Sequence, residues 1–187
     1  MRDGIGSAGG QPAEARAVDE EGAQAGAQPL ASLLILALIL FIGFAIYAQT
    51  LGQWFSGDDF WFLRSSQATP FWEYAGKAFD FRETGTLPEL DRYRPLYPIA
   101  WRLQYEVFGL DALGYHSVLL GLHLASISVV WLIGRRLTTS EWGAGLVALI
   151  FAIHPAYADA VSWLSGGNRV FATLPYLLSL YLFMKHR

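Results

Sequence analysis

The feature that most constrains the fold is a stretch without charged residues that runs from Gly22 to Gly57. Its second part, Leu30–Leu51, is predominantly apolar. At 1.5 Å per residue, a helix of this length crosses the roughly 30 Å hydrocarbon core of a bilayer. The stretch therefore predicts a transmembrane helix.

Three further apolar runs contain no Asp, Glu, Lys or Arg: Ala112–Gly134, Trp142–Ala158 and Val170–Met184. The first has the length of a span. The other two are about 15–17 residues long, near the lower limit for a crossing, and could instead form a helical hairpin. The pattern predicts an all-α integral membrane protein with about four transmembrane helices, near residues 30–51, 112–134, 140–155 and 165–185.

The positions of the basic residues predict the orientation. Arg135 and Arg136 separate the second and third runs, and Lys185 and Arg187 follow the fourth. The positive-inside tendency places both clusters in the cytoplasm. The N-terminus is then cytoplasmic and the long loop after the first span lies outside. The expected location is a multi-pass protein of a membrane, the plasma or inner membrane if the source is bacterial.

Composition divides the chain in two. Residues 1–28 are rich in Gly, Ala, Gln and Glu and lack apolar periodicity, so they are predicted to be a disordered cytoplasmic N-terminus, followed by a membrane domain over 29–187. The formal net charge of −3 argues against a nucleic-acid partner. The absence of cysteine excludes disulfides and thiolate metal sites.

The outer loop, residues 52–111, is rich in aromatic side chains, as membrane interfaces are. Two short helices are predicted to lie along the membrane surface there. One spans Ala68–Phe79, with Thr69 as its N-cap. The other spans Pro98–Phe108 and contains an Arg102–Glu106 pair at i,i+4 spacing. Such a loop can form a pocket at the level of the lipid headgroups.

Asp58 and Asp59 are the first candidates for chemistry. A carboxylate that faces such a pocket can act as a general base toward an acceptor hydroxyl, or the pair can bind a divalent metal such as Mg²⁺ or Mn²⁺. Because acids after glycine are common in turns, the alternative is that they only cap the next segment.

Cationic candidates for binding a phosphate are Arg92, Arg94 and Arg102, because guanidinium groups bind phosphate bidentately. The alternative is a set of salt bridges to nearby acids. His154 and Asp159 could line the same pocket, or could cap a tight turn between two helices.

Two histidines lie in the second span. His116 and His123 are seven residues apart and share one helical face. They could face a cavity, or they could form hydrogen bonds to neighbouring helices. Before the third run, Thr138 and Glu141 predict a capping box, and Pro155 is predicted to end that helix.

Several of these features occur in a recognisable order: Asp58-Asp59, Arg94-Pro95-Leu96, Tyr115-His116, His123, and Phe151-Ala152-Ile153-His154-Pro155 followed by Asp159-Ala160-Val161. Together they resemble the N-terminal half of GT-C-fold glycosyltransferases. The likeness is closest to the branch in which transmembrane spans precede tetratricopeptide repeats, relatives of the protein O-mannosyltransferases.

The resemblance implies transfer of a sugar from a polyprenyl-phosphate carrier to an acceptor hydroxyl on the outer side of the membrane. It implies that Asp58, together with Asp59, orients or deprotonates the acceptor or holds a metal. It also implies that Arg94 and His154 lie near the carrier phosphate or the sugar.

The chain departs from the family pattern in three places. Leu119 stands where the family often has Asn, and Gly167-Asn168-Arg169 replaces a common Gly-Arg-x-Asp pattern. The chain also ends after the fourth predicted span. We therefore expect an incomplete GT-C module that depends on a missing C-terminal half or on a partner subunit.

Two functions remain open from the sequence. The first is a membrane glycosyltransferase, or the N-terminal fragment of one, with a lipid-linked sugar as donor and a protein or glycan as acceptor. The alternative is a non-catalytic membrane scaffold or assembly subunit that uses its outer loop as a binding surface. A transporter is disfavoured because the apolar runs of the predicted spans carry no Asp, Glu, Lys or Arg.

Overall fold

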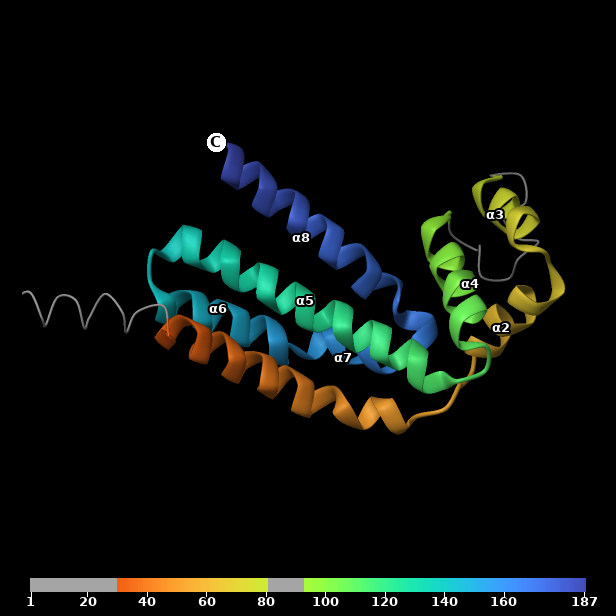
Figure 1. Cartoon of the computed structure of the whole chain (residues 1–187), viewed down its shortest axis with the longest axis horizontal. Coiled ribbons are helices and arrows are strands. Elements are labelled where there is room, and N and C mark those ends of the chain that lie inside the picture. The colour runs from red at the N-terminus through yellow and green to blue at the C-terminus, as the bar shows by residue number, and fades with distance from the viewer. Residues whose placement is uncertain (1–29, 81–92) are drawn as a thin grey trace, which may run out of the picture.

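A computed structural model describes residues 30–80 and 93–187, and this part of the chain is helical, without strands. Long helices form an elongated bundle, and short helices gather at one end of it (Figure 1). The predicted all-α class is confirmed. The predicted disordered segment, residues 1–28, lies outside the described residues.

Two helices are long and apolar enough to cross a membrane: Leu30–Gly52, which ends in the 3-10 turn η1 (Ala48–Gly52), and α5 (Ala112–Thr138). They correspond to the first two predicted spans. α5 extends four residues past the predicted end, so that Arg135 and Arg136 lie in its last turn. Basic side chains there complement the negative end of the helix dipole.

The third predicted span is bent. α6 (Glu141–Ile153) is only 13 residues long, and a break of 45° separates it from the segment Pro155–Ser162, which contains η4 (Pro155–Tyr157) and α7 (Ala158–Ser162). The bent pair counts as one crossing at most. Pro155 ends α6 as predicted, because its ring excludes a continued helix.

A short 3-10 turn, η5 (Leu164–Gly166), leads into α8 (Asn168–His186). α8 is 19 residues long but does not reach the apolar character of the other two spans. By length and composition the described residues thus contain two candidate spans, or three if the bent pair is one span.

α5 is the central element of the bundle. It packs against α6 and α8, which lie beside it in Figure 1. Ala144, Ala148 and Ala152 are fully buried at i,i+4 spacing on the face of α6 that meets α5. A Cβ atom built on Gly134 of α5 would lie 3.0 Å from the Cα atom of Ala144. Small residues of this kind let two membrane helices approach closely.

Three short helices follow the first span: α2 (Asp59–Ala68), α3 (Phe71–Phe79) and α4 (Leu96–Phe108). The predicted start of a helix at Ala68 is wrong, because Ala68 ends α2, and Thr69 is the C-cap of α2 rather than an N-cap. The residue before a proline disfavours the helical region, and Thr69 is extended at φ −131° and ψ 135°.

α4 begins two residues earlier than predicted and contains the expected ion pair. Arg102 Nη2 lies 2.6 Å from Glu106 Oε1. The predicted capping box of Thr138 and Glu141 is wrong. The N-cap of α6 is Ser140, whose hydroxyl oxygen accepts a hydrogen bond from the Gly143 amide at 3.3 Å.

The close approach of α5 to α6 generates a test of the packing. Gly134→Leu should lower the free energy of unfolding by about 1–3 kcal/mol, because the added side chain meets the backbone of Ala144. Gly121→Leu, at an open position of the same helix, is the control and should have little effect. Thermal unfolding of both variants in detergent measures the difference, and equal melting temperatures would contradict the packing.

Candidate functional site

Asp59 is a buried anchor rather than a free acid. Only 1% of it is exposed. Its Oδ2 atom accepts a hydrogen bond from the Ser56 amide at 2.9 Å. Its Oδ1 atom accepts from the Ser165 amide at 2.8 Å and from the Ser165 hydroxyl. Both oxygens of this carboxylate are therefore engaged, and they join the start of α2 to η5.

Asp58 has the opposite environment. It occupies the N-cap position of α2, its side chain makes no capping hydrogen bond, and the residue is exposed. The positive end of the α2 dipole favours a negative charge there. Of the two adjacent carboxylates, the one at Asp58 is available for an external ligand.

The turn that presents Asp58 has identifiable supports. Gly57 has φ +52°, a left-handed conformation that glycine adopts without strain. Just before it, the ring of Phe55 is buried in an edge-to-face contact with Tyr115 of α5, with ring centres 5.2 Å apart. The turn is thus held between the first span and α5.

Tyr97 of α4 also contacts η5, the turn that holds Asp59. Its hydroxyl donates a hydrogen bond to the Leu164 carbonyl in η5. Burial, and secondarily the charge of Asp59, raise the pKa of Tyr97 well above its usual value, so the hydroxyl keeps its proton. α2, α4 and η5 therefore meet in one packed cluster, centred on rings that include Phe62 and Trp101.

The two histidines of α5 differ from each other. His123 Nε2 lies 3.4 Å from the Ala152 carbonyl of α6, and its ring packs among the rings of Tyr47, Phe151 and Tyr157. This is the alternative in which the histidine bonds to a neighbouring helix. His116 is 1% exposed, and neither of its ring nitrogens has a hydrogen-bond partner among the described residues.

The candidate cations are not equivalent. Arg94, just before α4, is exposed and forms no ion pair with the described residues. Arg102 is largely buried and its charge is neutralised by Glu106, which matches the alternative of a salt bridge. Arg92 lies outside the described residues.

His154 caps a turn. Its Nδ1 atom accepts a hydrogen bond from the Ala156 amide at 3.1 Å, and the residue is exposed. Asp159, also exposed, lies in the first turn of α7. α7 packs against η5, which holds Asp59, so Asp159 lies at the same end of the bundle as Asp58.

A metal site on the aspartate pair would need further ligands. No group of three or more His, Cys, Asp and Glu side chains is placed to hold a metal within the ranges 30–80 and 93–187. Because both oxygens of Asp59 already accept hydrogen bonds, Asp58 is the member of the pair with free ligand atoms.

Reasoning from sequence assigned no role to Ser165 or Tyr97. The bond between Asp59 and Ser165 joins positions 106 residues apart in the chain. No local spacing signals such a contact. Tyr97 follows the Arg94-Pro95-Leu96 motif directly, and this was the available signal for it.

The anchor predicts different effects for the two acids. Asp59→Asn should lower the free energy of unfolding by about 2–3 kcal/mol, because an amide group would point a donor at amide and hydroxyl donors. Asp58→Asn is the matched control and should cost under about 1 kcal/mol. Thermal unfolding in detergent is the measurement, and equal losses would contradict the assignment of Asp59 as anchor.

Comparison with known proteins gives a consistent set of relatives. No family model matches the chain, and no solved structure matches it. It is 34% identical over 165 residues to "Protein O-mannosyl-transferase tmtc2" of Xenopus laevis, which covers 84% of this chain and 19% of that relative. It is 31% identical over 153 residues to "Protein O-mannosyl-transferase TMTC2" of Homo sapiens (78% of this chain, 18% of the relative). It is 35% identical over 94 residues to "Protein O-mannosyl-transferase Tmtc1" of Drosophila melanogaster (50% and 11%). The chain thus spans a fifth or less of the length of these relatives, and its homologues are protein O-mannosyl-transferases of the TMTC group.

Proposed function

We propose that this chain forms part of a GT-C-type membrane glycosyltransferase that transfers a sugar from a polyprenyl-phosphate carrier to an acceptor hydroxyl. Two findings support it: the relatives are named as O-mannosyl-transferases, and the chain carries candidate membrane-spanning helices. Because the chain covers only part of those relatives, the proposed activity is that of the assembled enzyme, including any C-terminal half or partner subunit.

The observation that carries the proposal is the difference between the two aspartates. Both carboxylate oxygens of Asp59 accept hydrogen bonds, one from Ser56 and the other from Ser165, and these bonds position the first turn of α2. Asp58 is then presented at that turn as an exposed carboxylate. A general base must be held rigidly and must also be reachable by its substrate, and the pair meets both requirements.

In the proposed reaction, Asp58 accepts the proton of the acceptor hydroxyl, and the oxygen of that hydroxyl attacks the anomeric carbon of the donor sugar. The bond between that carbon and the carrier phosphate breaks, and the phosphate leaves with the electron pair. Arg94, which is exposed and forms no ion pair with the described residues, stabilises the negative charge on this leaving group, together with Arg92 and His154. Asp159 contributes to the donor pocket, and Arg102 stabilises α4 through its i,i+4 ion pair with Glu106 in the same helix.

If the enzyme binds a divalent metal here, Asp58 would be the residue that holds it, and the metal would supply positive charge to neutralise the leaving phosphate. The acceptor is a hydroxyl on a protein or glycan. The role of Asp59 as the anchor of α2 is the same with or without a metal, and for a protein or a glycan acceptor.

The proposed topology has four crossings, with a cytoplasmic N-terminus and the Asp58 end outside. Trp54, Trp61 and Trp72 are exposed at this end of the molecule, and Trp72 of α3 is 83% exposed. Tryptophan concentrates at membrane interfaces, so these side chains favour a position at headgroup level, where a lipid-linked phosphate lies.

Replacement of the base tests the mechanism. Asp58→Asn should reduce transfer by about 10²–10⁴-fold, with normal insertion, because the acceptor loses its proton acceptor. Glu73→Gln, an exposed acid in α3, is the control. The assay is transfer from a lipid-linked sugar in membranes that contain the natural gene product. Undiminished transfer by the Asp58 variant would overturn the base assignment, whereas absence of transfer by the parent protein would favour the scaffold alternative.

Topology has its own test in this cysteine-free chain. Ser56→Cys beside Asp58 should react with a membrane-impermeant thiol reagent in intact cells, because Ser56 is exposed at the proposed outer end. Thr139→Cys, at the other end of α5, should react only after permeabilisation. The reverse pattern would invert the proposed orientation.

A further inference from the structure

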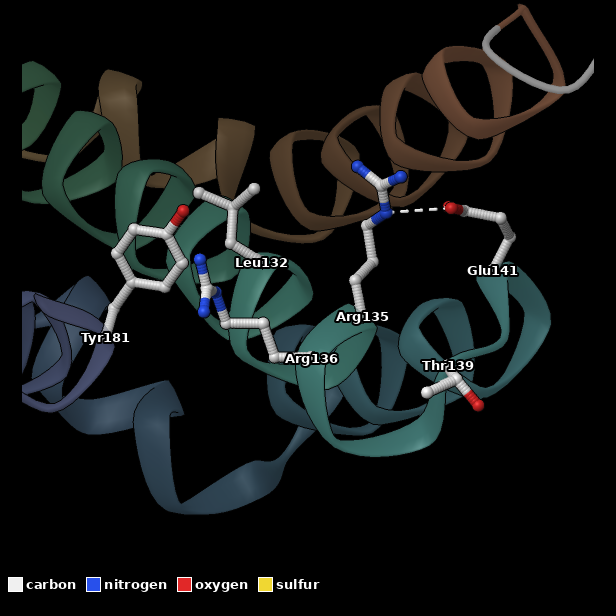
Figure 2. Close-up of a pocket in the computed structure, with 6 residues that line it drawn as sticks. All are labelled: Leu132, Arg135, Arg136, Thr139, Glu141 and Tyr181. Carbon is white, nitrogen blue, oxygen red and sulfur yellow. Dashed lines mark hydrogen bonds and ion pairs between the residues drawn. The ribbon is translucent and has the colours of Figure 1, made fainter. Parts of the chain in front are cut away.

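A polar pocket lies at the end of the bundle away from Asp58. It has a volume of about 390 Å³ and lies where the last turn of α5, the first residue of α6 and the last turns of α8 meet (Figure 2). Its lining residues are Leu132, Arg135, Arg136, Thr139, Glu141 and Tyr181. Nothing in the proposed transfer reaction uses this pocket.

The charge of the pocket is positive, with two guanidinium groups against one carboxylate. Arg135 is already neutralised, since its Nε atom lies 2.7 Å from Glu141 Oε1 and its guanidinium stacks 4.8 Å from the centre of the Trp131 ring. Figure 2 shows Arg135 and Glu141 directed toward each other at one side.

Arg136 is held in place but forms no ion pair among the residues that the structure describes. Its Nη1 atom donates to the Met184 carbonyl at 3.2 Å, and the guanidinium lies 5.2 Å from the centre of the Tyr181 ring. These two contacts tie it to α8 and leave its other donors for a ligand. A guanidinium in this state suits a phosphate oxygen.

The surroundings of the pocket indicate a lipid rather than a soluble anion. Leu132 forms an apolar part of the pocket wall. Leu137 and Trp142, which directly follow the lining residues Arg136 and Glu141 in the sequence, are 70% and 78% exposed. α5 is about 40 Å long at 1.5 Å per residue, so its last turn reaches the headgroup region of a bilayer that it crosses. Exposed Leu and Trp beside arginine are typical of the boundary between acyl chains and headgroups.

We propose that this pocket binds the headgroup phosphate of an anionic membrane phospholipid. Arg136 contacts the phosphate directly. Thr139 lines the pocket beside it, with a left-handed backbone at φ 51°, a strained conformation for a β-branched residue. Glu141 limits the affinity because it occupies Arg135. Basic pockets between membrane helices are a known type of lipid site.

The test uses the purified chain in detergent micelles, with native mass spectrometry to count retained lipid. Phosphatidylglycerol should be retained in preference to phosphatidylcholine. Arg136→Gln should weaken phosphatidylglycerol binding about fivefold, the loss expected for one arginine at a membrane surface. Arg64→Gln, an exposed arginine of α2 at the other end, is the matched control and should bind as the parent does.

A second variant separates binding from folding. Glu141→Gln should strengthen phosphatidylglycerol binding, because it frees Arg135 for the phosphate. Damage to the fold would weaken binding instead, so this variant decides the matter if Arg136→Gln proves unstable. Equal retention of the two lipids, or no gain with Glu141→Gln, would overturn the proposal. Displacement of phosphatidylglycerol by equimolar inorganic phosphate would identify a soluble-anion site and overturn the assignment to lipid.

Discussion

The hydrogen bonds of Asp59 to Ser165 and Ser56 are the interaction on which the candidate site depends. They join a turn after the first span to a turn before α8, across most of the length of the chain. A buried carboxylate is costly unless its oxygens accept hydrogen bonds, and here they accept three. This requirement fixes where α2 begins, and therefore where Asp58 lies.

α5 provides the frame in which this interaction forms. Its first turns pack with η5 and α7, and its last turns pack with α6 and the end of α8. Gly134 and the buried alanines of α6 let α5 and α6 approach closely. Larger side chains such as Leu or Phe at these positions would hold the two helices apart. α5 thus runs from the end of the bundle where α2 and η5 lie to the end that carries Arg135 and Arg136 (Figure 1).

The two ends have complementary electrostatics. The Asp58 end combines an exposed carboxylate with the exposed Arg94 and exposed tryptophans, a set suited to proton transfer beside a phosphate. The other end combines Arg135 and Arg136 with one glutamate, a set suited to holding an anion without chemistry. Asp58 and the two arginines therefore lie at opposite ends of the bundle.

The sequence by itself determined the helical class, the two long apolar spans, the break at Pro155 and the Arg102–Glu106 pair. Each depends on neighbours within a few residues: hydropathy over a window, the fixed φ of proline, or an i,i+4 spacing. The sequence-based prediction was wrong about the end of α2, where Thr69 before Pro70 ends the helix, and about the N-cap of α6, which is Ser140 rather than Thr138. Only the tertiary structure decided that Asp59 is an anchor and that Asp58 is the accessible acid. The two adjacent acids have the same local sequence context, and no local spacing signals that Ser165, 106 residues further along the chain, bonds to Asp59.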